Sequence, residues 1–88
     1  MTAPHKLTGS DPEYTAAAID HGVQGAMSVR CIVGLDGHVH HCRVVKGLPF
    51  MDRAVIEALE QRVYSPALLD GQPIEVDYTF DLRLTLPD

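Results

Sequence analysis

Hydrophobic and polar residues alternate most strictly in the last segment of the chain, residues 74–86. The apolar positions are Ile74, Val76, Tyr78, Phe80, Leu82, Leu84 and Leu86, and every position between them is polar or charged. A period of two is typical of a strand with one buried and one solvent-facing side, and it does not fit a helix. We therefore predict a long strand over residues 74–86.

A β-hairpin is predicted in the first half of the chain. Residues 25–33 alternate between apolar and polar side chains, and Asp36-Gly37 follows them. Both residue types accept the positive φ angles of a tight hairpin turn. The return strand is expected from His38 to about Val45, where a Gly-Leu-Pro sequence interrupts the pattern.

Two helices are predicted on either side of this hairpin. Apolar residues at three-to-four spacing between Phe50 and Val63 indicate an amphipathic helix. A shorter helix is expected to start at Asp11-Pro12, because aspartate caps free backbone N–H groups and proline suits the first helical position. Gly22 is expected to end this helix.

The order helix, strand, strand, helix, strand predicts an α+β fold. A helical crossover makes the second and third strands parallel, so the third can pair beside the first. The result is a three-stranded antiparallel sheet in the order 2-1-3, with both helices packed on its apolar face. Residues 1–9 show no periodicity and are expected to be the end of a flexible linker, which leaves residues 10–88 as the domain.

The last strand is an edge strand in this arrangement, with unpaired N–H and C=O groups along one side. Proteins often protect such an edge with charge, and Asp77, Asp81 and Arg83 could serve that purpose. The alternative is that the edge accepts a strand from a partner. Periodicity does not distinguish the two.

Composition narrows the range of functions. The 88 residues carry a formal net charge of −5, which does not suit a nucleic-acid partner because phosphates require clustered Lys and Arg. The sequence has no nucleophile motif, no Gly-rich phosphate loop and no apolar run long enough to span a bilayer. We predict a protein that is not an enzyme and that needs no cofactor.

Two cysteines flank the predicted hairpin turn. A two-residue loop places Cys31 directly opposite Cys42, at a distance that a disulfide can bridge, whereas a four-residue loop places Cys31 opposite His40. Two buried free thiols are the alternative to a bridge. Cys31, His38, His40 and Cys42 also form a donor set that suits zinc, although their spacing matches no standard zinc motif.

From residue 14 to residue 86 the chain resembles the C-terminal domain of TonB, a family of energy transducers in Gram-negative envelopes. The matching segments are Pro12-Glu13-Tyr14 with the alanine run, Asp36-Gly37-His38-Val39, residues 51–59, Tyr64-Ser65-Pro66-Ala67 and Asp70-Gly71-Gln72-Pro73-Ile74. The family usually has Tyr-Pro where this chain has Tyr14-Thr15.

The resemblance implies a periplasmic domain, anchored in the inner membrane through an upstream region that also meets a proton-driven complex. It implies that the last strand pairs with an extended peptide, the TonB box, of an outer-membrane transporter and transmits force to it. The partner-binding residues carried over are Glu13, Tyr14, Val76, Asp77, Tyr78, Thr79, Phe80, Asp81, Leu82 and Arg83. Other possibilities are an adaptor domain of a TolA-like or motility complex, and a homodimer that pairs two last strands.

Overall fold

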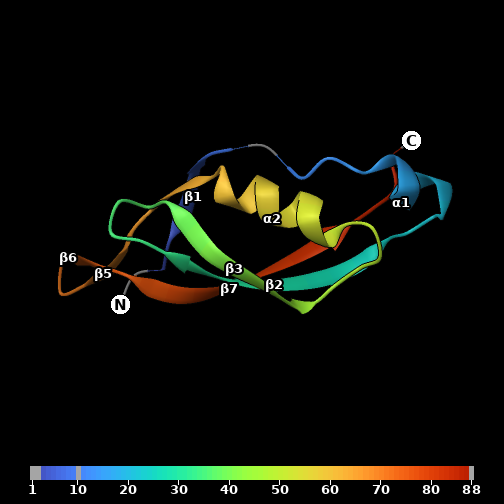
Figure 1. Ribbon diagram of the computed structural model, residues 1–88. Coiled ribbons are helices and arrows are strands. Elements are labelled where there is room, and N and C mark those ends of the chain that lie inside the picture. Colours follow the sequence, from blue (N-terminus) through green and yellow to red (C-terminus); the bar gives the residue numbers. More distant parts are fainter. Residues whose placement is uncertain (1–2, 10, 88) are drawn as a thin grey trace.

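The computed structural model describes residues 3–9 and 11–87. Its central sheet has three antiparallel strands in the order β3-β2-β7 (Figure 1). These are β2 (Gly25–Val33), β3 (Val39–Lys46) and β7 (Val76–Leu84). The predicted fold class and strand order are confirmed. The last strand is shorter than predicted at both ends, because Ile74 belongs to a separate strand and β7 ends at Leu84 and not at Leu86.

Two helices lie on the same side of the sheet, α2 (Asp52–Glu60) above its middle and α1 (Ala16–Asp20) towards one end (Figure 1). Val55 and Leu59 of α2 are completely buried. They share the core with the inward-facing side chains of β2. Full burial of one such aliphatic side chain contributes about 1.5–3 kcal/mol. The core is therefore a layer between α2 and the sheet, and Ala18 of α1 extends it. No helix within the described ranges is long and apolar enough to cross a membrane.

The first helix starts later than the sequence predicts. Its N-cap is Thr15, whose Oγ1 accepts a hydrogen bond from the Ala18 N–H at 3.1 Å, and not Asp11. The Thr15 hydroxyl also donates to the Phe50 carbonyl oxygen at 3.0 Å, so a contact distant in sequence helps to fix the cap. Residues 11–15 are consequently a non-helical segment that runs alongside the domain.

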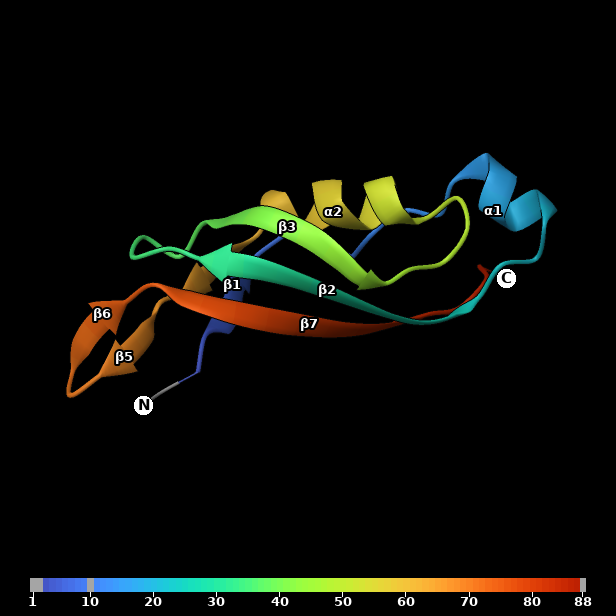
Figure 2. The same ribbon diagram turned by 60° about the horizontal axis from the view of Figure 1, so that its bottom comes forward.

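Four short strands were not predicted. β1 (His5–Thr8) pairs with β4 (Val63–Ser65), and β5 (Ala67–Leu69) pairs with β6 (Gln72–Ile74). The expectation of no element in residues 1–9 is wrong for β1, because three or four residues are too few for alternation to appear. β5 and β6 form a hairpin that extends from the sheet at the end opposite α1 (Figure 2).

The tip of the β2–β3 hairpin is fastened to β4 at Gly37. The carbonyl oxygen of Gly37 accepts a hydrogen bond from the Tyr64 N–H at 2.9 Å, and His38 forms an isolated bridge with Val63. Gly37 has φ +84°, and a Cβ on it would lie 1.8 Å from the Tyr64 carbonyl oxygen. Only glycine permits the backbones of residues 37 and 64 to lie this close together, and this contact holds β4 against the sheet.

Candidate peptide-binding groove

The strand β7 has one occupied edge and one open edge. It pairs with β2 in a single unbroken register from Gly25↔Leu84 to Val33↔Val76. Among the described residues, no strand pairs with its other edge. In an antiparallel pair every second residue directs its N–H and C=O away from the partner. The outer edge of β7 therefore presents a row of backbone donors and acceptors.

The polar side of β7 is occupied by contacts across the sheet. The carboxylate of Asp77 lies 3.1 Å from Arg30 on β2 and 2.9 Å from Arg43 on β3. Asp81 accepts a hydrogen bond from the Ser28 hydroxyl at 2.7 Å, and Thr79 accepts one from Arg30 at 3.2 Å. These side chains reach across the exposed face of the sheet towards β2 and β3, and away from the outer edge of β7.

Hydrogen bonds from Arg30, and then from Arg43, lower the pKa of Asp77 below the ordinary value of an aspartate. A depressed pKa in the folded state adds stability above the unfolded-state pKa, and this stability is lost as the pH falls through the folded-state value. We expect the Asp77→Asn variant to lose less stability than the wild type between about pH 5 and pH 2. Urea midpoints measured at each pH check this, and parallel curves for the two proteins would contradict it. Some acid sensitivity should remain, because His38 lowers the pKa of Asp36.

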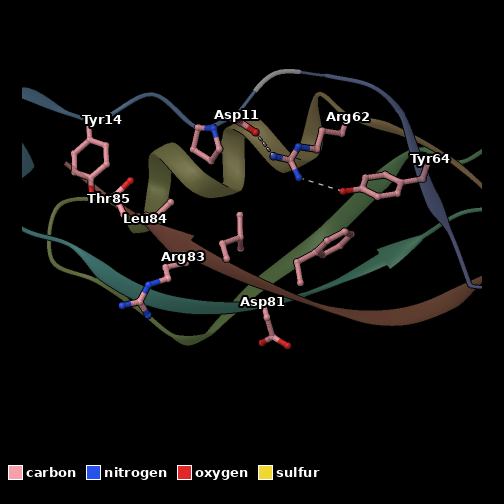
Figure 3. A pocket seen from close by; sticks show the side chains of 11 residues that line it. Asp11, Tyr14, Arg62, Tyr64, Asp81, Arg83, Leu84 and Thr85 are labelled. Atoms are coloured by element: carbon pink, nitrogen blue, oxygen red, sulfur yellow. Dashed lines mark hydrogen bonds and ion pairs between the residues drawn. The ribbon is translucent and has the colours of Figure 1, made fainter. Parts of the chain in front are cut away.

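A groove of about 520 Å³ lies beside the C-terminal half of β7 (Figure 3). Its walls come from residues 11–14, from the segment that follows α2, and from β7. The lining residues are Asp11, Pro12, Tyr14, Arg62, Tyr64, Phe80, Asp81, Leu82, Arg83, Leu84 and Thr85. The groove therefore runs beside the same strand that carries the open edge.

Arg62 is a largely buried charged side chain that lines this groove. Its side chain is only 9% exposed, and it donates a hydrogen bond to the Tyr64 hydroxyl at 3.1 Å. The Tyr64 ring packs edge-on against Phe80 of β7, with ring centroids 5.3 Å apart. An exposed carboxylate, Asp11, lies 3.8 Å from the guanidinium. The sequence pattern did not reveal this role, because it placed Arg62 in the last turn of a helix predicted to reach Val63, whereas α2 ends at Glu60 and β4 begins at Val63.

The structure divides the predicted partner-binding residues into two groups. Tyr14 and residues 80–83 line the groove, although the side chains of Asp81 and Arg83 point away from Arg62 (Figure 3). Residues 76–79 lie farther along β7 and do not line it. Glu13 lines a second depression of about 390 Å³, between residues 11–15 and α2. The Tyr14 hydroxyl donates to the Val23 carbonyl oxygen at 2.9 Å, which fixes its ring at one end of the groove.

The β2–β3 hairpin contains a bulge that neither predicted register includes. Arg30 faces Arg43, as a two-residue loop requires, but nearer the turn Ile32 faces His40. The extra residue is His41, whose φ of 52° is unusual for a residue with a side chain. A second shift lies at the other end of the ladder, where Ser28 faces Lys46. The predicted register therefore holds only at Val29 and Arg30, since such shifts depend on local backbone geometry and not on apolar alternation.

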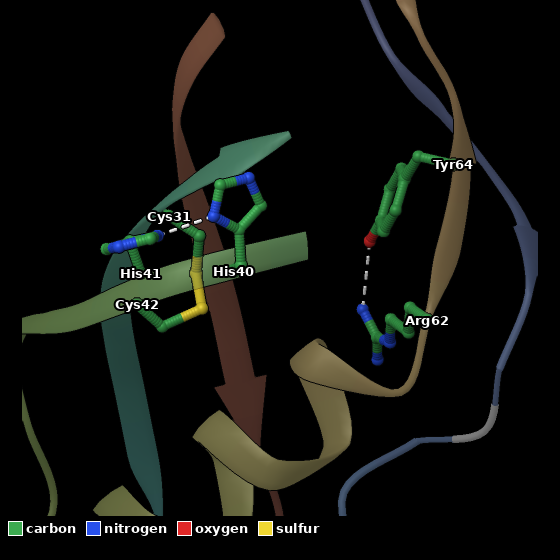
Figure 4. The surroundings of a disulfide bond; sticks show 6 residues. All are labelled: Cys31, His40, His41, Cys42, Arg62 and Tyr64. Atoms are coloured by element: carbon green, nitrogen blue, oxygen red, sulfur yellow. Dashed lines mark hydrogen bonds between the residues drawn. A yellow bond between two sulfur atoms is a disulfide. The ribbon is translucent and has the colours of Figure 1, made fainter. Parts of the chain in front are cut away.

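Cys31 and Cys42 are joined by a disulfide at this bulge, with a Cα–Cα distance of 4.0 Å (Figure 4). Cys31 is fully buried in the core, and the bond ties the central strand to β3. Two bonded sulfurs cannot act as thiolate ligands, so the proposed zinc set of Cys31, His38, His40 and Cys42 loses both sulfur donors. Across the described part of the chain, no three His, Cys, Asp or Glu side chains are placed to hold a metal ion.

Comparisons with known proteins agree with this fold. The family model described as Gram-negative bacterial TonB protein C-terminal matches residues 10–85. The solution NMR structure of the Pseudomonas aeruginosa TonB CTD superimposes with a TM-score of 0.77 at 21% sequence identity, covering 97% of this chain and 88% of that one. No curated protein matches the chain. Because the family model spans the sheet, both helices and the groove, the chain belongs to the family of Gram-negative bacterial TonB C-terminal domains, the protein-interaction domains of TonB-type energy transducers.

Proposed function

We propose that this domain binds an extended, TonB-box-like segment of an outer-membrane transporter by adding it as a fourth strand to the outer edge of β7. TonB C-terminal domains are periplasmic domains of Gram-negative bacteria, a location in which such a segment is within reach. The observation that carries the proposal is the coincidence of the open edge of β7 with the groove beside it. A region upstream of this domain would connect it to a proton-driven complex of the inner membrane.

The position of the groove determines which part of β7 the peptide would lie beside. It accompanies β7 over residues 80–85, which corresponds to roughly 20 Å of extended chain. Main-chain hydrogen bonds to the outward-facing residues would hold the peptide, and each net bond contributes about 1 kcal/mol. Alternate peptide side chains would then point into the groove, towards Tyr14 and Tyr64, and the others would point towards solvent.

A titration with an extended peptide tests the proposal directly. We expect an eight-residue peptide of TonB-box type to shift the backbone amide signals of residues 75–85 first in two-dimensional NMR spectra. Signals of β3 should move little, because β2 separates that strand from the open edge. Unchanged signals in residues 75–85 at millimolar peptide would overturn the proposal.

Methylation of the peptide backbone provides a sharper control. Two peptides of one sequence would carry N-methyl groups on alternate residues, one set on the odd and the other on the even positions. Strand addition places the N–H groups of only one set against β7, so one peptide should lose binding and the other should keep it. Equal binding by both would exclude strand addition. A sedimentation mass of twice 9.6 kDa, together with no peptide shifts, would indicate instead that a second copy occupies the edge.

A further inference from the structure

We infer that His41, the extra residue of β3, closes the second edge of the sheet and so prevents copies of this chain from joining edge to edge without limit. The sheet has two outer edges, one on β3 and one on β7 (Figure 2), and among the described residues no strand pairs with either. If both edges were open, β3 of one copy could pair with β7 of the next, and such a head-to-tail contact need not close on itself. The inference concerns β3 and is independent of the proposed binding of a peptide to β7.

The ladder between β3 and β2 changes register twice. Val39 and His40 pair with β2 in one register. Arg43 and Val44 pair in the next, and Lys46 in a third. At each shift, the residues that direct N–H and C=O groups outward change from one alternate set to the other. A partner strand needs these groups at every second residue, so β3 offers it no continuous row, whereas β7 keeps one register over nine pairs.

The core contacts on the two sides of the bulge are out of step by one residue. Val39 is buried in the core, and Cys42 and Val44 pack against it. Inward-facing positions of a regular strand are two residues apart, but Val39 and Cys42 are separated by two intervening residues. His41 takes up the additional residue with a φ of 52° and an exposed side chain. The bulge therefore lets both halves of β3 reach the core.

The bulge is held in place from both sides. Cys42 directly follows His41 and is bonded to Cys31 of the central strand. Moving the extra residue past this point would turn Cys42 to the other face of the sheet, away from Cys31. Moving it towards the turn would shift the hairpin tip, which Gly37 fastens to β4. The interruption of the β3 edge is consequently a fixed feature of the fold.

The charges of the two edge strands favour a second copy as the partner that the bulge excludes. β3 carries Arg43 and Lys46 and no carboxylate, whereas β7 carries two aspartates and one arginine. Opposite charges across paired strands are stabilising, and like charges directly opposite are destabilising. β3 of one copy therefore suits β7 of the next better than it suits another β3. This pairing is the one that could repeat from copy to copy.

Deletion of His41 tests the inference. Val39, Cys42 and Val44 would then fall at every second position, so β3 should become regular, with Cys31 still opposite Cys42 and the domain still folded. The sedimentation mass of the deletion variant should rise beyond twice 9.6 kDa between micromolar and millimolar concentration, whereas the wild type should not exceed that mass. Backbone amide signals of both β3 and β7 should shift with concentration in the variant.

His41→Gly is the matched control. It removes the imidazole, which contacts that of His40 (Figure 4), but it keeps the extra residue, and glycine adopts a positive φ readily. The bulge should therefore remain, and the variant should assemble no further than the wild type. The control separates the number of residues in β3 from the chemistry of the side chain.

The other outcomes would overturn the inference. A folded deletion variant that never exceeds twice 9.6 kDa would mean that the bulge is not what closes β3. An unfolded deletion variant would contradict the regular strand that the core contacts predict. Assembly of the wild type beyond a dimer would show that β3 is already open, and assembly of His41→Gly would assign the effect to the imidazole. None of these results bears on strand addition to β7, which the peptide titration tests separately.

Discussion

Replacing Gly37 with alanine should lower the free energy of unfolding by roughly 3–5 kcal/mol. The added Cβ would lie 1.8 Å from the carbonyl oxygen of Tyr64, and the backbone at φ +84° disfavours any side chain. To relieve the overlap, the hairpin tip must move away from β4, which breaks the hydrogen bond from the Tyr64 N–H. Urea denaturation followed by circular dichroism measures the loss.

Gly71 supplies the matched control. Its φ of +79° is nearly that of Gly37, but a Cβ added at this position would have no atom within 4 Å. Gly71→Ala should therefore lose only the backbone contribution, about 1–2 kcal/mol. If the two variants were equally destabilised, the contact between the hairpin tip and Tyr64 would not be a source of stability.

Reduction of the Cys31–Cys42 disulfide should lower the stability by about 2–3 kcal/mol, the value expected when a short loop is opened in the unfolded chain. The sulfur of Cys31 is shielded in the core, so the protein should be reduced in denaturant and refolded with reductant present. The urea midpoint should then fall by roughly 2 M for a domain of this size. Thermal unfolding should shift in the same direction.

The Cys31→Ala/Cys42→Ala double variant separates the bond from other effects of the reductant. Its urea midpoint should be the same with and without reductant, and it should lie close to that of the reduced wild type. A wild-type midpoint that does not respond to reduction would mean that the β2–β3 pairing and the core hold the hairpin without the covalent link. Mass spectrometry confirms the redox state of each sample.

The parts of the fold that follow from side-chain periodicity were predictable. Apolar residues at every second position of residues 25–33, and strict alternation in residues 74–86, predict the two longest strands, and Asp36-Gly37 predicts the turn between β2 and β3. The chain order then gives the position of β7 at the sheet edge. These elements depend on one apolar side that must be buried, and a single sequence shows that requirement directly.

The features that depend on contacts between distant residues were not predictable in this way. Thr15 caps α1 in part because Phe50 accepts its hydroxyl hydrogen, and β1 exists only because β4 lies beside it. Arg62 is the most important omission. It directly follows the α2 cap and precedes β4, so its burial depends on how the chain turns there and on Tyr64, two positions later. A charged residue so close to a helix end gives no sign of that burial.

The pairings of the central strand β2 with its two neighbours differ in how they resist force. β2 is bound to β3 through a bulged ladder and one covalent bond, and to β7 through nine consecutive residue pairs without a bulge. A pull along the axis of β7 shears all of those pairs at once, whereas a pull across the sheet would peel them apart one after another. The domain therefore resists tension best along β7, which is also the direction in which a strand added to its edge would be drawn.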